Sequence, residues 1–109
     1  MSRKSTSANY IDLVFENQYE DFKDFYDENK EIIYKSILEV FKGFTKSKKK
    51  SLTLHLSAKI KDLDWDTEFK FSRNETIVLK RDLMPYFEEI EDYETCNDIK
   101  NLYKEITTS

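Results

Sequence analysis

The side chains best able to bind a metal ion lie together in one short segment, Asp62-Leu63-Asp64-Trp65-Asp66-Thr67-Glu68. Its acids stand at the first, third and fifth positions, as in a calcium-binding loop. Such a loop also needs glycine at position six and a bidentate glutamate at position twelve, where this chain has Thr67 and Arg73. We therefore interpret the segment as a solvated hairpin turn whose acids pair with neighbouring lysines. Neither a metal nor another cofactor is predicted.

The single histidine, His55, and the single cysteine, Cys96, are the other side chains that zinc binding or nucleophilic catalysis would need. Residue alternation places His55 on the polar face of a strand, as a surface histidine without a role. Helical spacing places Cys96 on an apolar stripe, as a buried thiol. The chain has no glycine-rich phosphate loop, no H-E-x-x-H motif and no recognisable Ser-His-Asp set. We therefore predict that the protein is not an enzyme.

Acidic residues are concentrated in two segments, although the net charge is only −4. Eight acids and two lysines lie between Asp12 and Glu31, and six acids without a base lie between Glu88 and Asp98. One interpretation is that these are solvated helix faces. The other is that they contact a basic partner, such as a nucleic-acid-binding protein or a positively charged enzyme cleft. The second interpretation predicts partner binding by Glu16, Glu20, Asp24, Glu88, Glu91 and Asp92.

Basic residues are concentrated between Lys42 and Lys61, where there are seven lysines and no acid. An alternative function follows, in which Lys46, Lys48, Lys49 and Lys50 bind phosphates of a nucleic acid. This alternative is weaker, because base stacking needs exposed rings and the one aromatic residue nearby, Phe44, belongs to a helical stripe. A nucleic acid is therefore not the partner we expect.

The element that must position these residues is a β-hairpin over residues 51–72, where apolar and polar residues alternate. The apolar face predicted for the first strand consists of Leu52, Leu54, Leu56, Ala58 and Ile60. With Lys61 opposite Asp64, Leu56 faces Phe69, and both are expected in the core. A register shift of one residue would turn every apolar side chain to water, so only shifts of two compete.

Two helices are predicted before the hairpin, because apolar residues recur at steps of three and four from residue 10 to residue 44. A single helix of that length would extend about 52 Å, more than the roughly 35 Å expected for a compact domain of this size. We therefore expect a break at residues 26–29, with Asp27 as the cap of the second helix. Gly43 is expected to end that helix in a left-handed conformation.

Helices are also predicted after the hairpin. Ser72-Arg73-Asn74-Glu75 matches a capping box and favours a short helix over residues 74–82, although a third strand over Thr76–Lys80 is the alternative. A second helix is expected from Asp82, with Pro85 in its first turn, and a last one from about residue 95. The predicted fold class is α+β, with the C-terminal helices on one sheet face. Residues 1–8 are expected to form a disordered tail and residues 9–109 a single domain.

A two-stranded sheet would leave the edge of Leu52–Ile60 open, which predicts a homodimer or strand addition through that edge. The single cysteine, and the absence of any apolar run of about 18 residues, predict a cytoplasmic protein without a membrane partner. We expect a small acidic, non-catalytic binding protein that occupies a partner, as small viral or phage inhibitors and accessory factors do. A structural subunit of a larger assembly is a further alternative.

Overall fold

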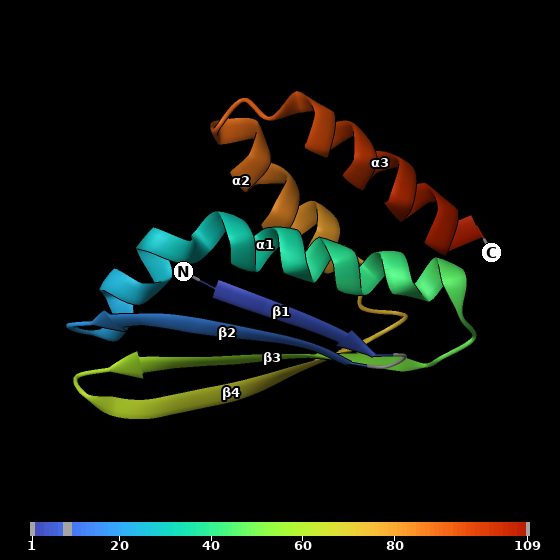
Figure 1. Ribbon diagram of the computed structural model, residues 1–109. Coiled ribbons are helices and arrows are strands. Elements are labelled where there is room, and N and C mark those ends of the chain that lie inside the picture. Colours follow the sequence, from blue (N-terminus) through green and yellow to red (C-terminus); the bar gives the residue numbers. More distant parts are fainter. Residues whose placement is uncertain (1, 8–9, 109) are drawn as a thin grey trace.

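The computed structural model describes the backbone of residues 2–7 and 10–108 and the side chains of residues 10–108. Its elements in chain order are β1 Ser2–Ser7, β2 Tyr10–Tyr19, α1 Phe22–Lys46, β3 Ser51–Ile60, β4 Leu63–Ser72, η1 Leu79–Leu83, α2 Met84–Glu89 and α3 Tyr93–Thr108. The four strands form one sheet in the order β1-β2-β3-β4, and the helices all lie on one of its faces (Figure 1). The α+β class is confirmed, but the prediction that two helices come first is wrong.

The first predicted helix is a strand. Ile11, Leu13 and Phe15 of β2 point to the helices and are buried, whereas Tyr10 and Asp12 lie on the other face. β2 pairs in parallel with β3, and α1 connects the two strands across the sheet. β1 pairs antiparallel with β2, so the expected tail at residues 1–8 is instead a strand over residues 2–7, and residues 1 and 8 lie outside the described part.

α1 is a continuous helix, so the break predicted at residues 26–29 is wrong. Asp21 caps its first turn by accepting a hydrogen bond of 2.8 Å from the Asp24 amide, and Asp27 instead pairs with Lys23 at 2.7 Å. Because residues 10–19 belong to the sheet, the helix needs only 25 residues, or about 37 Å. That length fits within the 45 Å long dimension of the molecule, so no break is required.

The sequence had predicted that Gly43 ends the helix in a left-handed conformation. In the structure Gly43 lies inside α1 and has no positive φ. A Cβ atom at this position would lie 2.9 Å from Cδ1 of Leu52 on β3. The glycine therefore allows the helix to approach the sheet closely, which is its second common use besides helix termination. The helix ends at Lys46, before Ser47.

β3 and β4 form the predicted antiparallel hairpin, but the register differs from the prediction by two residues. Ile60 pairs with Leu63, and the turn consists of Lys61 and Asp62, whose φ values of 54° and 64° are those of a type I′ turn. The apolar face is unchanged by this shift, as the period of two requires. Leu54, not Leu56, therefore lies opposite Phe69.

Residues 77–83 are helical, so a third strand over Thr76–Lys80 is excluded, but the helix predicted over residues 74–82 begins three residues late because residues 74–76 belong to the turn that follows β4. The Ser72 amide donates to the Glu75 carboxylate over 2.7 Å, which is half of the predicted capping box. η1 is a π-helical turn, in which the Met84 amide donates to the Leu79 carbonyl, and it continues into α2. This wider turn accommodates Pro85, which has no N–H to donate, near the start of α2.

The core lies mainly between the sheet and α1. α1 contacts β2 and β3 on one side and α3 and η1 on another, so the C-terminal helices pack chiefly on α1. Leu56 is buried as predicted, whereas Phe69 is 44% exposed and is not a core residue. Cys96 is partly buried against the core. Across residues 10–108, no helix combines the length and the apolar character needed to cross a membrane.

Candidate functional site

The first group of predicted partner-binding acids lies where β2 ends and α1 begins. Glu16, Glu20 and Asp24 are all exposed there. A register irregularity in β2 between Val14 and Gln18 displaces Glu16 from regular pairing with β3. We call Glu16, Glu20 and Asp24 the acidic end of the molecule. The structure thus brings these three residues, which are four positions apart in sequence, to one end of the fold.

The second predicted group lies elsewhere, at the connection between α2 and α3. Figure 1 shows this connection well separated from the start of α1. Glu88 and Glu91 are exposed, whereas Asp92 caps α3 through bonds of 3.2 and 2.7 Å from the amide and hydroxyl of Thr95. These bonds hold the pKa of Asp92 below its ordinary value. The structure does not join the two acidic groups, and it gives Asp92 a structural role.

The predicted phosphate-binding lysines form a basic end at the opposite end of α1. Lys46 closes the helix, and Lys48, Lys49 and Lys50 are exposed on the connection to β3. Arg73 fixes this connection, because its guanidinium donates to the carbonyl oxygens of Ser47 at 2.5 Å and Lys49 at 3.2 Å. The same guanidinium lies over the Phe44 ring, 5.3 Å from its centre. The lysines are therefore presented on an ordered backbone.

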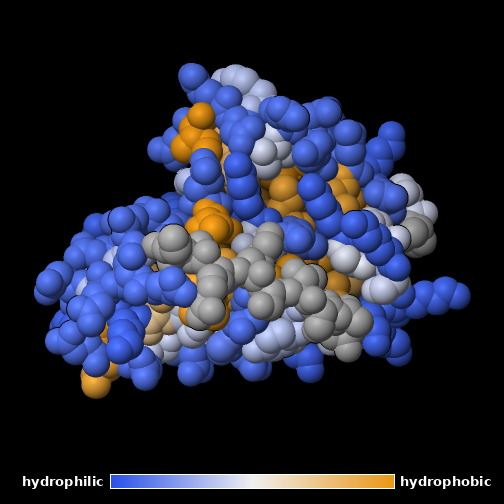
Figure 2. Space-filling view, in the orientation of Figure 1, coloured by the Kyte–Doolittle hydropathy of each residue, from blue (hydrophilic) through white to orange (hydrophobic). Residues whose placement is uncertain are grey.

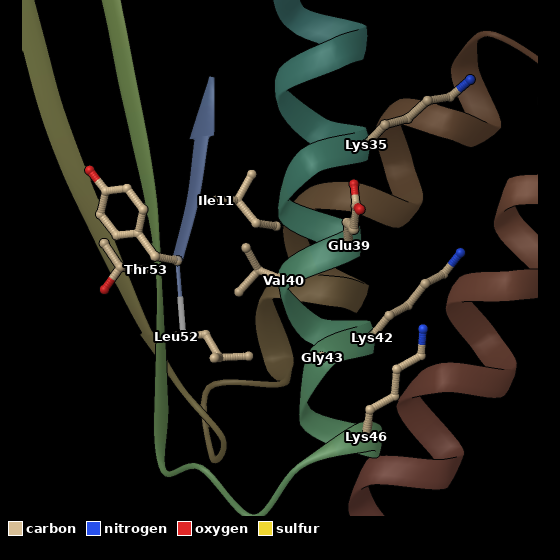
Figure 3. A pocket seen from close by; sticks show the side chains of 10 residues that line it. Ile11, Lys35, Glu39, Val40, Lys42, Gly43, Lys46, Leu52 and Thr53 are labelled. Atoms are coloured by element: carbon tan, nitrogen blue, oxygen red, sulfur yellow. The ribbon is translucent and has the colours of Figure 1, made fainter. Parts of the chain in front are cut away.

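A hollow of about 390 Å³ lies between α1 and the start of β2 and β3. Lys35, Glu39, Lys42 and Lys46 of α1 line this hollow, and Figure 3 shows the three lysines extending from the helix away from the strands. Its apolar surface comes from Ile11, Val40 and Leu52. The ammonium groups would favour an anionic group at this rim, although the Glu39 carboxylate offsets part of that charge. Figure 2 shows that hydrophilic residues dominate the visible face of the molecule as a whole.

The open face of the sheet contains a constellation that the sequence interpretation missed. β2 pairs Asp12 with His55 of β3, and Nδ1 of His55 lies 2.7 Å from Oδ1 of Asp12. Nε2 lies 3.7 Å from Oδ1 of Asp66 on β4, and the ring stacks on Tyr10 with centres 6.0 Å apart. The His55 side chain is only 20% exposed. His55 is therefore an anchored residue, in contrast to the surface histidine without a role that we expected.

The hydrogen bond to Asp12 raises the pKa of His55 above 6.5, and the carboxylate of Asp66 adds to this effect. Because the folded-state pKa is the higher one, protonated His55 stabilises the fold below pH 6.5, and this contribution disappears as the pH rises through the folded-state pKa. Among the described hydrogen bonds, none joins His55 to a serine, threonine or cysteine.

We expect Asp12→Asn to destabilise the protein more at about pH 6 than at about pH 9, because only protonated His55 gains from the carboxylate. Thermal unfolding of both proteins at the two pH values measures this difference. Titration of the single histidine by NMR tests the cause directly. We expect a His55 pKa above 6.5 in the wild type and a lower pKa in Asp12→Asn. A wild-type pKa at or below 6.5 would show that the pair does not form in solution.

Across residues 10–108, no group of three or more histidine, cysteine, aspartate or glutamate side chains is arranged to hold a metal ion. The calcium-like segment is divided by the hairpin, because Asp62 lies in the turn and Asp64 and Asp66 lie in β4. No protein-family model, curated protein or solved structure matches this chain. Its function must therefore be argued from the arrangement of its own residues.

Proposed function

We propose that this protein is a non-catalytic binding protein that occupies a basic surface of a partner protein through its acidic end. The observation that carries the proposal is the separation of charge along α1. Glu20 and Asp24 flank the start of this helix, and Lys46 and Lys48 flank its end, about 37 Å away. A partner with a basic surface would be attracted to the first end and repelled by the second, so the arrangement favours one orientation of docking.

The positions of these acids suit them for recognition. Glu16 lies in the irregular part of β2, Glu20 in the bend between β2 and α1, and Asp24 in the first turn of α1. Asp21 and Asp27 nearby are used internally, as the helix cap and in the Lys23 ion pair, and contribute less. Exposed acids of this kind accelerate association and determine orientation more than they increase affinity. Apolar contacts with the partner would have to supply most of the binding free energy.

A second candidate function is binding of a nucleic-acid backbone by the basic end, and the ordered connection held by Arg73 favours it. Two observations weigh against it. The Arg73 guanidinium is engaged with carbonyl oxygens and the Phe44 ring, and Phe44 is itself only 1% exposed. The basic end therefore offers ammonium groups without an exposed ring on which a base could stack. Its binding to nucleic acid would be weak and would fall steeply with salt.

A capture experiment tests the proposal. The tagged protein is incubated with lysate of its source cells, with and without nuclease treatment, and the retained proteins are identified by mass spectrometry. The acidic-end variant carries Glu16→Gln, Glu20→Gln and Asp24→Asn. It should retain at least about tenfold less of the specific partner than the wild type does. The matched control, Glu94→Gln with Asp98→Asn and Glu105→Gln, changes the net charge equally on α3 and should retain it.

Three results would contradict the proposal. An equal loss in the α3 control would show that only net charge matters. A partner retained by the acidic-end variant would place the interface elsewhere. The third result is captured protein that is lost on nuclease treatment and is not captured by a variant with Lys48, Lys49 and Lys50 replaced by glutamate. This result would favour nucleic-acid binding by the basic end.

A further inference from the structure

The outer edge of β4 presents a row of backbone groups that no described strand pairs with. Because a two-residue turn joins β3 and β4, the closing pair Ile60–Leu63 is hydrogen-bonded, and every second pair beyond it is bonded as well. The Arg73 amide, which donates to the Lys50 carbonyl over 3.0 Å, continues this series. The N–H and C=O groups that point away from the hairpin therefore belong to the residues between, Asp64, Asp66, Glu68 and Lys70.

This edge lacks most of the features by which proteins protect exposed strands. β4 is ten residues long, contains no proline and pairs with β3 without a bulge. The residues of its helix-facing side carry no charge; they are Leu63, Trp65, Thr67, Phe69 and Phe71. The edge ends at Ser72, where the amide is already bonded to Glu75.

The same side of β4 carries a strip of accessible apolar side chains. Leu63 is 71% exposed and Phe69 is 44% exposed. Phe22 of α1, which is 51% exposed, lies against Trp65 with the ring centres 5.3 Å apart. A strand added beside β4 would place every second side chain against this strip. Apolar side chains at those positions would bury surface that is now open to water.

The other side chains of such a strand would face Asp64, Asp66, Glu68 and Lys70, three acids and one base. A second copy of β4 matches this row less well than a basic strand would. The antiparallel pairing that uses all four outward residues of both copies is centred on Thr67. It sets Asp64 opposite Lys70 at the two ends, but at the centre it sets Asp66 of each copy directly opposite Glu68 of the other. Like charges directly opposite each other destabilise a strand pair. A strand with basic side chains at alternate positions would meet opposite charges.

We propose that the outer edge of β4 binds, by strand addition, an extended segment of a partner protein in which lysine or arginine alternates with apolar residues. The backbone of the segment pairs with the four outward-facing residues of β4. Its basic side chains lie against Asp64, Asp66 and Glu68 on the open face, and its apolar side chains lie on Trp65 and Phe69. This inference goes beyond the proposed function, because it uses a different surface and does not require the acidic end.

A titration with a synthetic peptide tests the charge pattern. The probe is a capped peptide of alternating lysine and valine, and the matched control peptide has glutamate in place of lysine. Trp65, the single tryptophan, lies in β4 and reports binding by its fluorescence. We expect a saturable change with the lysine peptide only, and binding about tenfold weaker in Asp66→Asn with Glu68→Gln. Unchanged binding in that variant would overturn the proposal.

Control variants separate this proposal from the proposed function. The acidic-end variant should bind the lysine peptide like the wild type, because Glu16, Glu20 and Asp24 lie outside β4. An equal loss of peptide binding in the acidic-end variant would show that net charge attracts the peptide, which overturns the strand-addition proposal. The capture experiment on the acidic end is unaffected by either result.

Two variants of Lys70 distinguish strand addition from simple charge attraction. Lys70→Gln removes a repelling charge and should bind the lysine peptide at least as well as the wild type. Lys70→Pro also removes that charge, but it deletes an outward N–H while leaving the hydrogen bonds to β3 intact. It should bind about tenfold more weakly than Lys70→Gln. Equal binding by the two variants would overturn the proposal.

Two further measurements address folding and self-association. Peptides methylated at the backbone nitrogens that face β4 should not bind the wild type, and this result is independent of whether Lys70→Pro folds. Binding of such methylated peptides would contradict strand addition. Sedimentation should show a wild-type monomer. A dimer that dissociates in Lys70→Pro would mean that a second copy occupies the edge, contrary to the proposal.

Discussion

Replacing Phe25 by alanine should lower the free energy of unfolding by about 3–5 kcal/mol, a large part of the stability of a domain of this size. Phe25 is fully buried at the start of α1. Its ring lies 4.9 Å from that of Phe15 on β2 and 5.5 Å from that of Trp65 on β4. The side chain thus joins the helix to two strands, and its removal leaves a cavity that none of them can fill alone. Urea unfolding measures the change.

Phe69→Ala is the matched control for Phe25→Ala. It removes the same number of atoms from a side chain that is 44% exposed, and it should cost only about 1 kcal/mol. The sequence had predicted the opposite, with Phe69 in the core opposite Leu56. If Phe69→Ala lowered the free energy of unfolding as much as Phe25→Ala does, Phe69 would be more deeply buried in solution than it is in the structure.

Thr53→Pro should destabilise the protein by about 3 kcal/mol or leave it unfolded, because β3 is an internal strand. Thr53 pairs with Tyr10 on β2 and with Lys70 on β4, so both edges of β3 are occupied. Its side chain lies on the open face and is partly buried, and the main effect would come from the lost backbone hydrogen bond to β2. Circular dichroism and thermal unfolding measure it.

This expectation replaces the predicted homodimer through Leu52–Ile60, which is wrong in its location because β2 covers that edge. Lys70→Pro on the outer edge of β4 is the control and should reduce stability much less than Thr53→Pro. A folded Thr53→Pro protein with wild-type stability would contradict the parallel pairing of β2 and β3. Thr53 would then have to lie at an edge, as the sequence had suggested.

The sequence by itself determined the elements whose contacts are local. Strict alternation and a two-residue turn determine the hairpin and its apolar face. The register error of two residues changed no face, because side chains repeat every two residues along a strand. A helical segment after Ser72 was also predicted, although it begins at residue 77, after a turn in which Glu75 accepts a hydrogen bond from the Ser72 amide. These features depend on neighbours within a few positions, so a single sequence suffices to find them.

Only the tertiary structure decided the state of residues 10–19. Ile11, Phe15 and Tyr19 recur at steps of four, which fit both a helical stripe and one face of a strand, because four is an even number. Leu13 lies between them and favours the strand, whereas Phe22 and Tyr26 continue the helical spacing. Parallel pairing with β3, more than 40 residues away, resolves the ambiguity, and no local pattern encodes such a partner.

The candidate sites differ for the same reason. Exposure of the acidic end and of Lys46, Lys48, Lys49 and Lys50 follows from their charge, so the sequence was sufficient to predict that exposure. The contact of His55 with Asp12 and the open edge of β4 depend on the order of strands in the sheet. Strand order is a long-range property, because it is determined by which apolar faces α1 covers together. Only the folded chain therefore shows that His55 is anchored and that β4, not β3, lies at the edge.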